Sequence, residues 1–156
     1  MRVTMMLADH AQVAEGKLYV SGGGWFLTGP GPVTAGVALL FHVPWVRTNR
    51  KTNFVLSLID ADGHPVTQAG PIGEQPIRVG GQFEVGRPAG VPAGTDINVP
   101  IVINTVALQL AAGKQYTWVL EVDGHSDDDW RLSFATRPLP EAPPQMPPMR
   151  PALPSG

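Results

Sequence analysis

The sequence predicts an all-β protein: a single antiparallel β-sandwich of eight or nine strands, with immunoglobulin-like or related Greek-key topology, followed by a proline-rich extension. Three observations lead to this prediction. Apolar and polar residues alternate through most of residues 3–134, as a pleated sheet with one buried face requires. Turn residues separate the alternating segments at short spacing, and no apolar stripe of helical period reaches ten residues.

The alternation and the turn residues place each strand. Glu15-Gly16 joins the first two strands as a tight hairpin, and the prolines and glycines of 29–32 precede the third. Asp62-Gly63 and Asp123-Gly124 predict two more tight turns, because Gly and, less readily, Asp adopt a positive φ. The predicted strands are 2–9, 17–26, 34–45, 52–60, 65–69, 76–85, 97–104, 114–123 and 129–136.

The segment 108–118 sharpens the topology. It reads LQLAAGKQYTW, which is similar to the corner of immunoglobulin-like sandwiches where a tyrosine hydroxyl hydrogen-bonds back to the backbone. Tyr116 would be this tyrosine.

Length and composition favour one domain. We place it at residues 1–136, and we assign residues 137–156, with eight of the 17 prolines, to a tail of extended polyproline II geometry. The chain lacks cysteine, its early apolar run is too short for a signal peptide, and no apolar stretch is long enough for a membrane span, so we expect a cytoplasmic protein. A net charge of −2 predicts no nucleic-acid partner.

Several apolar residues fall where they could contact a partner. The strand 37–43 is apolar on both faces, so it is either central in its sheet or covered by another subunit. Trp25 and Trp45 end strands beside Gly or Pro, and the tail carries spaced apolar residues that a groove could bind. The predicted interface residues are Val37, Leu40, Val43, Trp25, Trp45, Leu139, Met146 and Met149.

Two acidic turns are candidates for calcium, which takes six to eight oxygen ligands. Their carboxylates are Asp60 and Asp62 in the first turn, and Asp123, Asp127, Asp128 and Asp129 in the second. The alternative is that both are hydrated turn tips. Basic residues at 47–51 also suggest a head-to-tail contact with the acidic residues 127–129 of a neighbouring subunit. No cofactor is predicted.

The sequence predicts no catalytic residue. Ser21, His10 and Asp9 could make a triad on paper, but adjacent Asp9 and His10 point to opposite faces of a strand. The glycines 22–24 are not followed by the Lys-Ser/Thr or the helix of a phosphate loop, so we interpret them as a bulge or a close backbone approach.

Residues 5–25, MMLADHAQVAEGKLYVSGGGW, carry a resemblance to a known family, together with segments 28–32, 42–45 and 83–88. The chain resembles an uncharacterised family of small bacterial β proteins, a domain of unknown function, over most of residues 1–136. The resemblance implies a bacterial, single-domain protein. It carries no catalytic or binding residue over to this chain.

We therefore expect a non-enzymatic binding or assembly module that acts through its protein surface, as a homo-oligomer or with another protein. The first alternative is a β-sandwich that binds a small ligand or a carbohydrate, with help from calcium. The second alternative is an enzyme of unknown type.

Overall fold

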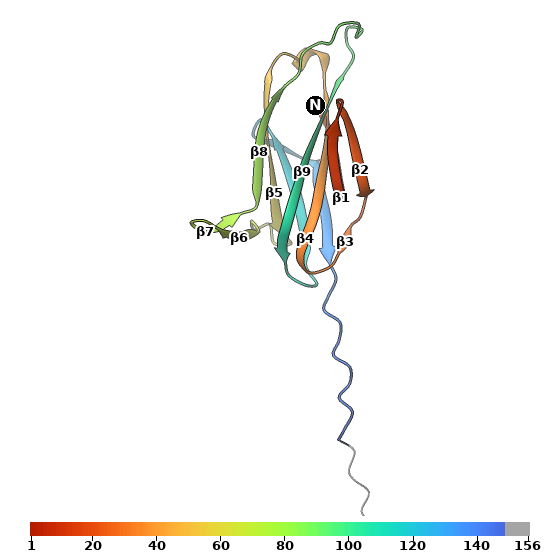
Figure 1. The fold of residues 1–156 in the computed structure, drawn as a ribbon. Coiled ribbons are helices and arrows are strands. Elements are labelled where there is room, and N and C mark those ends of the chain that lie inside the picture. Colours follow the sequence, from red (N-terminus) through yellow and green to blue (C-terminus); the bar gives the residue numbers. More distant parts are fainter. Residues whose placement is uncertain (149–156) are drawn as a thin grey trace, which may run out of the picture.

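The computed structural model describes residues 1–148 and confirms an all-β protein (Figure 1). The one helix in this range is a 3-10 turn, Trp45–Arg47, so no described helix is long enough to cross a lipid bilayer. The strands are β1 (Arg2–Ala14), β2 (Lys17–Gly23), β3 (Leu27–Thr28), β4 (Gly31–Val43), β5 (Lys51–Asp60), β6 (Thr67–Gly70), β7 (Gly73–Pro76), β8 (Arg78–Glu84), β9 (Ile97–Leu110), β10 (Gln115–Val122) and β11 (His125–Thr136).

Residues 1–148 form two large sheets and one small one. Strand order is β2-β1-β4-β9 in the first sheet, β3-β11-β10-β5-β8 in the second, and β6-β7 in the third. The prediction of eight or nine strands is too low, because β3 has two residues and β7 follows the Gly-Pro-Ile-Gly turn of 70–73. The purely antiparallel prediction is wrong at one pair, since β3 runs parallel to β11.

The predicted hairpin turns are confirmed. Glu15 and Gly16 join β1 to β2 with φ of 51° and 68°, and Asp123 and Gly124 join β10 to β11 with φ of 48° and 80°. Two positive φ values in a two-residue turn match the right-handed twist of the flanking strands. Local turn chemistry therefore sets the register of both hairpins.

Strand β4 is central, which explains its two apolar faces. It pairs with β1 on one side and β9 on the other. Its inward residues Val37, Leu39, Phe41 and Val43 are each at most 1% exposed, and Leu40 on the outer face is half-buried. Val37 and Val43 are therefore core residues with almost no solvent-accessible surface for a partner to contact. This corrects their prediction as interface residues.

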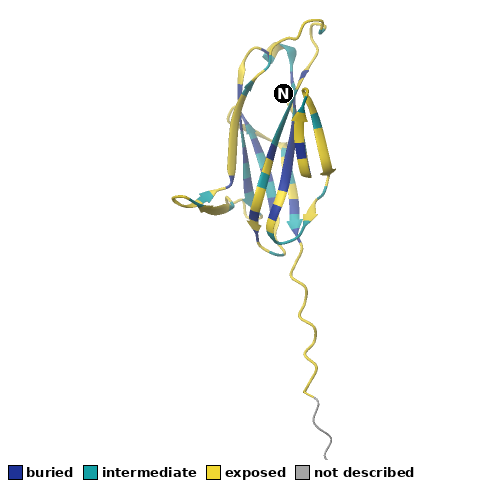
Figure 2. Cartoon of the chain, viewed as in Figure 1, coloured by how far each residue is buried: buried dark blue, intermediate teal, exposed yellow. Residues whose placement is uncertain are grey.

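The two large sheets share one hydrophobic core, seen as the dark blue bands on the strands (Figure 2). Aromatic rings connect the sheets: Phe41 of β4 lies 5.7 Å from Phe54 of β5 and 4.8 Å from Phe83 of β8, measured between ring centroids. Trp118 of β10 is the largest fully buried side chain among the described residues. Close packing of these large rings makes this region sensitive to changes in volume.

The predicted tyrosine corner is present. The backbone N–H of Ala111 donates a hydrogen bond (2.9 Å) to the hydroxyl of Tyr116, the second residue of β10, which is buried. The hydroxyl thereby satisfies a backbone donor of the turn that leaves β9. This bond fixes the connection between the two large sheets.

Strand β1 pairs with β4 only as far as Ala8. Beyond that point the backbone of Ala11 is hydrogen-bonded by a side chain of β9. Asn104 of β9 donates from Nδ2 to the Ala11 carbonyl (2.9 Å), and its Oδ1 accepts the Ala11 N–H (3.3 Å). Gly36 makes room for this contact, because a Cβ there would lie 2.8 Å from Asn104 Oδ1. We call this arrangement the Asn104 clamp.

The glycine block of β2 permits a close approach, as interpreted from the sequence. Gly22 has a φ of 60°, and a Cβ there would lie 2.7 Å from Asp9 Cγ. A Cβ at Gly23 would lie 2.7 Å from the Met6 sulfur. Larger residues at these positions would displace the side chains of Asp9 and Met6.

The tail begins at a fixed point. Arg137 donates its N–H to the Thr28 carbonyl (2.9 Å) and accepts the Gly113 N–H (3.1 Å). Residues 138–148 form no strand or helix, and the ribbon leads away from the two sheets (Figure 1). The division into a domain at 1–136 and a tail at 137–156 stays a prediction.

Candidate interaction surface

The two acidic turns lie at opposite ends of the second sheet. β5 and β10 are antiparallel, with Asp60 opposite Tyr116 and Phe54 opposite Val122. The turn after β5 and the turn after β10 therefore cannot meet. A calcium site that combines Asp60 and Asp62 with Asp123, Asp127, Asp128 and Asp129 is excluded.

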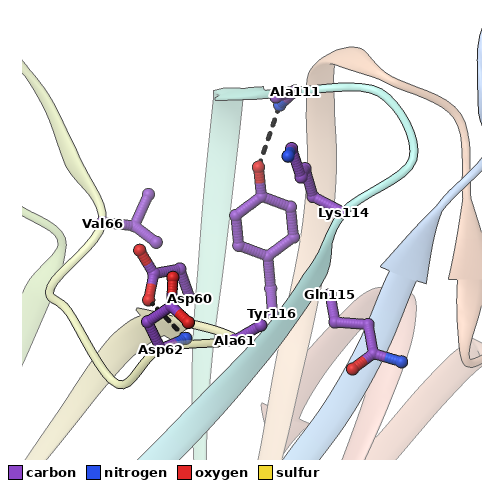
Figure 3. Close-up of a pocket in the computed structure, with 8 residues that line it drawn as sticks. All are labelled: Asp60, Ala61, Asp62, Val66, Ala111, Lys114, Gln115 and Tyr116. Carbon is purple, nitrogen blue, oxygen red and sulfur yellow. Dashed lines mark hydrogen bonds between the residues drawn. The ribbon is translucent and has the colours of Figure 1, made fainter.

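The first turn folds around the carboxylate of Asp60 (Figure 3). Asp60 Oδ1 accepts the N–H groups of Asp62 and His64, both at 2.9 Å, which is the ordinary role of Asp in a tight turn. Ligand atoms of Asp60, Asp62 and His64 lie within 4.8 Å of one another. A cavity of about 340 Å³ beside them reaches Lys114 and Tyr116.

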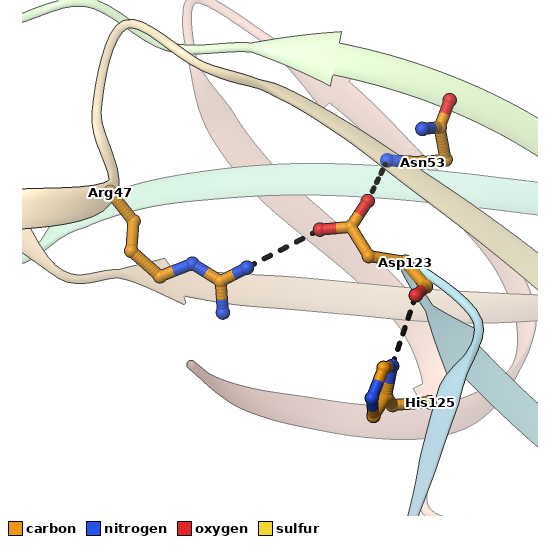
Figure 4. A network of polar contacts seen from close by, with 4 residues as sticks. All are labelled: Arg47, Asn53, Asp123 and His125. Atoms are coloured by element: carbon orange, nitrogen blue, oxygen red, sulfur yellow. Dashed lines mark hydrogen bonds and ion pairs between the residues drawn. The ribbon is translucent and has the colours of Figure 1, made fainter.

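In the second turn the carboxylate of Asp123 already has partners (Figure 4). Asp123 pairs with Arg47 through Oδ2 (3.3 Å) and accepts the Asn53 N–H at Oδ1 (2.9 Å). Asp127 accepts the Asp129 N–H. Arg47 and the second turn lie at the same end of the sheet and pair within one chain. The contact of the basic residues 47–51 with the acidic residues 127–129 of a neighbouring subunit stays a prediction.

We predict that calcium leaves the stability of the protein unchanged. Three exposed or half-exposed ligands fall short of the six to eight oxygens that calcium takes, so the folded state gains little by binding it. Millimolar calcium should shift the melting temperature by less than about 1 °C, measured by differential scanning fluorimetry with EDTA as the control. A larger shift that Asp60→Asn removes would establish a site at the first turn.

Neither candidate tryptophan is a free platform. Trp25 packs edge-on against Phe134 with the ring centroids 5.7 Å apart, and its indole nitrogen is buried. The guanidinium of Arg87 covers Trp45 at 4.6 Å and donates to Thr48 (2.8 Å). Stacking on a sugar ring would have to displace these contacts, which weakens the carbohydrate alternative.

The tail residues predicted for the interface do not pack on their own domain where the structure describes them. Leu139 is 72% exposed and Met146 is 91% exposed. Met149 lies outside the described residues. Their role in an interface stays a prediction, as does that of Leu40.

The sequence did not reveal a polar row on the outer face of the first sheet. His42 lies between Thr4, at 3.1 Å from Nε2, and Asn98, at 2.8 Å from Nδ1. A hydroxyl, an imidazole and an amide in this order resemble a catalytic triad in connectivity. The row lies across three strands of a sheet face and its hydrogen bonds are exposed, so its contacts serve strand pairing.

The most exposed β structure is the hairpin β6–β7, which we call the arm (Figure 1). It projects sideways from the two large sheets, and neither of its strands pairs with a third strand among the described residues. Both faces are largely exposed (Figure 2). Ile72, in the turn between the two strands, is 88% exposed. A two-stranded hairpin of this kind is marginal in water without further support.

The base of the arm is held firmly. Val66 donates to the Leu58 carbonyl (2.9 Å), Ile77 to the Val66 carbonyl (2.8 Å), and Leu58 to the Ile77 carbonyl (3.0 Å). Ile77 is also a core residue, 5% exposed. The arm therefore leaves the domain from a fixed origin.

A cavity of about 250 Å³ lies between the arm and β9. Gln68 and Gln75 of the arm form one wall, and Val79, Val106 and Leu108 supply apolar surface. Val106 is 77% exposed because β9 bulges there, with Ala107 at a φ of 54°. Exposed apolar groups at the tip and the base make the arm the candidate interaction surface.

Sequence reasoning predicted a strand at 65–69, which overlaps β6, but it missed β7 and therefore the arm, because β7 is short and lacks apolar alternation. The sequence signal that could have found it is Gly70-Pro-Ile-Gly73, a turn tetrapeptide with an apolar residue at its tip.

Comparison with known proteins gives one family match. Residues 3–135 match a family described as "Family of unknown function (DUF6941)". No curated protein and no solved structure matches the chain. The match spans both large sheets and the arm.

Proposed function

The chain belongs to the family of unknown function DUF6941, and from that premise we propose that it is a non-enzymatic assembly module that binds further copies of itself through its surface. The observation that carries this proposal is the arm: an exposed hairpin on a rigid base, with Ile72 88% exposed at its tip. An apolar group displayed in this way lowers the free energy when a partner covers it.

We also propose that the two large sheets form an immunoglobulin-like β-sandwich. The neighbours β1-β4-β9 on one side and β11-β10-β5-β8 on the other follow the strand arrangement of that fold, and the Tyr116 corner supports it. Domains of this architecture present their edges and loops to partners. The cytoplasmic location and the absence of a nucleic-acid partner stay predictions.

Native mass spectrometry of the full-length chain tests the assembly function. We expect the mass to rise from 16.6 kDa to a multiple of it as the protein concentration increases into the micromolar range. Size-exclusion chromatography with light scattering at several loading concentrations is the independent measurement. A mass of 16.6 kDa at every concentration would contradict self-assembly.

Small-ligand binding is the second candidate, favoured by the cavity beside Tyr116, where Asp60 and Lys114 present opposite charges. A ligand that occupies this cavity would raise the melting temperature in proportion to the logarithm of its concentration. The two candidates differ in outcome, because ligand binding leaves the mass of the protein independent of its concentration.

A further inference from the structure

We propose that two copies of the chain join by pairing their β6 strands antiparallel across a twofold axis. The product is a four-stranded sheet in the order β7-β6-β6-β7. This inference rests on the proposed self-assembly and names the element that performs it. Four features of the arm support it.

The first feature is the free edge of β6. The Val66 carbonyl accepts the Ile77 N–H and the Val66 N–H bonds to the Leu58 carbonyl, so both backbone groups of Val66 point inward, toward Ile77 and β5. Hydrogen-bonded and non-hydrogen-bonded pairs alternate along an antiparallel ladder. The backbone groups of Thr67 and Ala69, opposite Pro76 and Glu74, therefore point away from β7.

The second feature is the difference between the two edges of the arm. The β6 edge offers an N–H and a carbonyl from each of Thr67 and Ala69. The corresponding residues of the β7 edge are Pro76, which has no N–H, and Glu74, which carries a charge. Proline and charge on an edge are devices that block strand addition. Strand β6 carries neither.

The third feature is that β6 has no proline and no charge, whereas most other edge strands of residues 1–148 carry a blocking feature. β9 contains Pro100 and a bulge, β8 has Arg78 and Glu84 at its ends, and β3 has only two residues, while β2 carries a single charge, Lys17, at its start. An edge without such a feature is open to strand pairing.

The fourth feature is self-complementarity on the axis. If Thr67 of one copy pairs with Ala69 of the other, Gln68 lies opposite Gln68 of the second copy. Residues directly opposite in an antiparallel pair have Cβ atoms about 4.5–5.5 Å apart, and like charges there repel. A glutamine amide carries both donors and an acceptor, so two of them bond to each other.

This register also covers the tip of the arm. The strands run in opposite directions, so the Pro71-Ile72 turn of each arm reaches the base of the other arm. Ile72 then loses much of its exposed surface. Backbone hydrogen bonds, the Gln68 pair and the two Ile72 side chains together make an interface that is symmetric and closed, as expected of a dimer.

A charge exchange at Gln68 tests the pairing. Gln68→Glu and Gln68→Lys proteins should each dissociate at least tenfold more readily than the natural protein, because each places two like charges on the axis. An equimolar mixture should form a heterodimer of intermediate charge, measured by native mass spectrometry. If the natural protein dimerises and each single variant dimerises equally well, the β6 pairing is wrong, although self-assembly itself still holds.

A matched pair of proline variants isolates the backbone hydrogen bonds. Ala69→Pro removes an outward N–H from β6, whereas Glu74→Pro removes the outward N–H of its cross-strand neighbour on β7. Neither N–H serves the hairpin itself. We expect Ala69→Pro to give a monomer with an unchanged circular dichroism spectrum and Glu74→Pro to remain a dimer. The reverse result would assign the interface to β7, and a monomeric natural protein would overturn both proposals.

Discussion

The Trp118→Ala protein should lose about 3–5 kcal/mol of its free energy of unfolding, which is the usual cost of truncating a buried tryptophan. Trp118 is fully buried on β10, between Leu58 of β5 and Leu132 of β11. Small domains have about 5–15 kcal/mol in total, so this single change would remove a large share of the stability. Urea denaturation followed by circular dichroism measures the loss as a shift in the midpoint.

Two further variants show that the loss comes from packing. The Trp118 indole N–H has no hydrogen-bond partner among the described residues, so Trp118→Phe removes no hydrogen bond and should cost under about 2 kcal/mol. Val119→Ala changes the next residue, which points to the outer face, and should cost under about 1 kcal/mol. Equal losses for Trp118→Ala and Val119→Ala would contradict the burial of Trp118.

The second large effect is expected at the Asn104 clamp. Asn104→Ala leaves the N–H and the carbonyl of Ala11 without their partner, and Ala11 is fully buried. An unsatisfied buried backbone group costs about 1–3 kcal/mol, so we expect a loss of about 2–3 kcal/mol after some relaxation. Asn98→Ala is the matched control, because Asn98 also lies on β9 but its hydrogen bond to His42 is exposed, and it should cost under about 1 kcal/mol.

Gly36 provides a coupling test of the clamp. A Cβ at Gly36 would lie 2.8 Å from Asn104 Oδ1 and 3.1 Å from the Ala11 nitrogen, so Gly36→Ala should break the same contact. The double variant should then lose less stability than the sum of the two single losses. Strictly additive losses would show that Gly36 and Asn104 act independently.

Local sequence patterns predicted a strand well where its own residues alternate between apolar and polar. Alternation located β4, β5 and β10 to within a few residues, and the Asp-Gly and Glu-Gly pairs predicted their turns. The first strand was predicted to end at residue 9 and runs to Ala14. Ala8 and Ala11 are both buried there, although they are three residues apart and so lie on opposite faces of the strand. The buried residues therefore no longer follow a period of two.

The candidate site depended on information that no local pattern contains. Two apolar faces on β4 do not say which face meets the opposite sheet, and Val37 and Val43 proved to be on that face. The acidic turns could be placed together only while the partners of β5 and β10 were unknown. Their antiparallel pairing puts the turns at opposite ends. The exposure of both edges of the arm could not be predicted either, because edge exposure is a property of the assembled sheets.

The pairing of β4 with β9 has a consequence for how the chain folds. The residues that face each other are between 54 positions apart, for Val43 and Ile97, and 79 positions apart, for Gly31 and Leu110. Hairpins such as β1–β2 form in about 1–10 μs, whereas domains dominated by distant pairings fold in about milliseconds to seconds. Until β9 pairs with it, the apolar segment 31–43 exposes one unpaired strand edge. Slow synthesis at low temperature should therefore raise the yield of native protein, because it lowers the concentration of chains in this state.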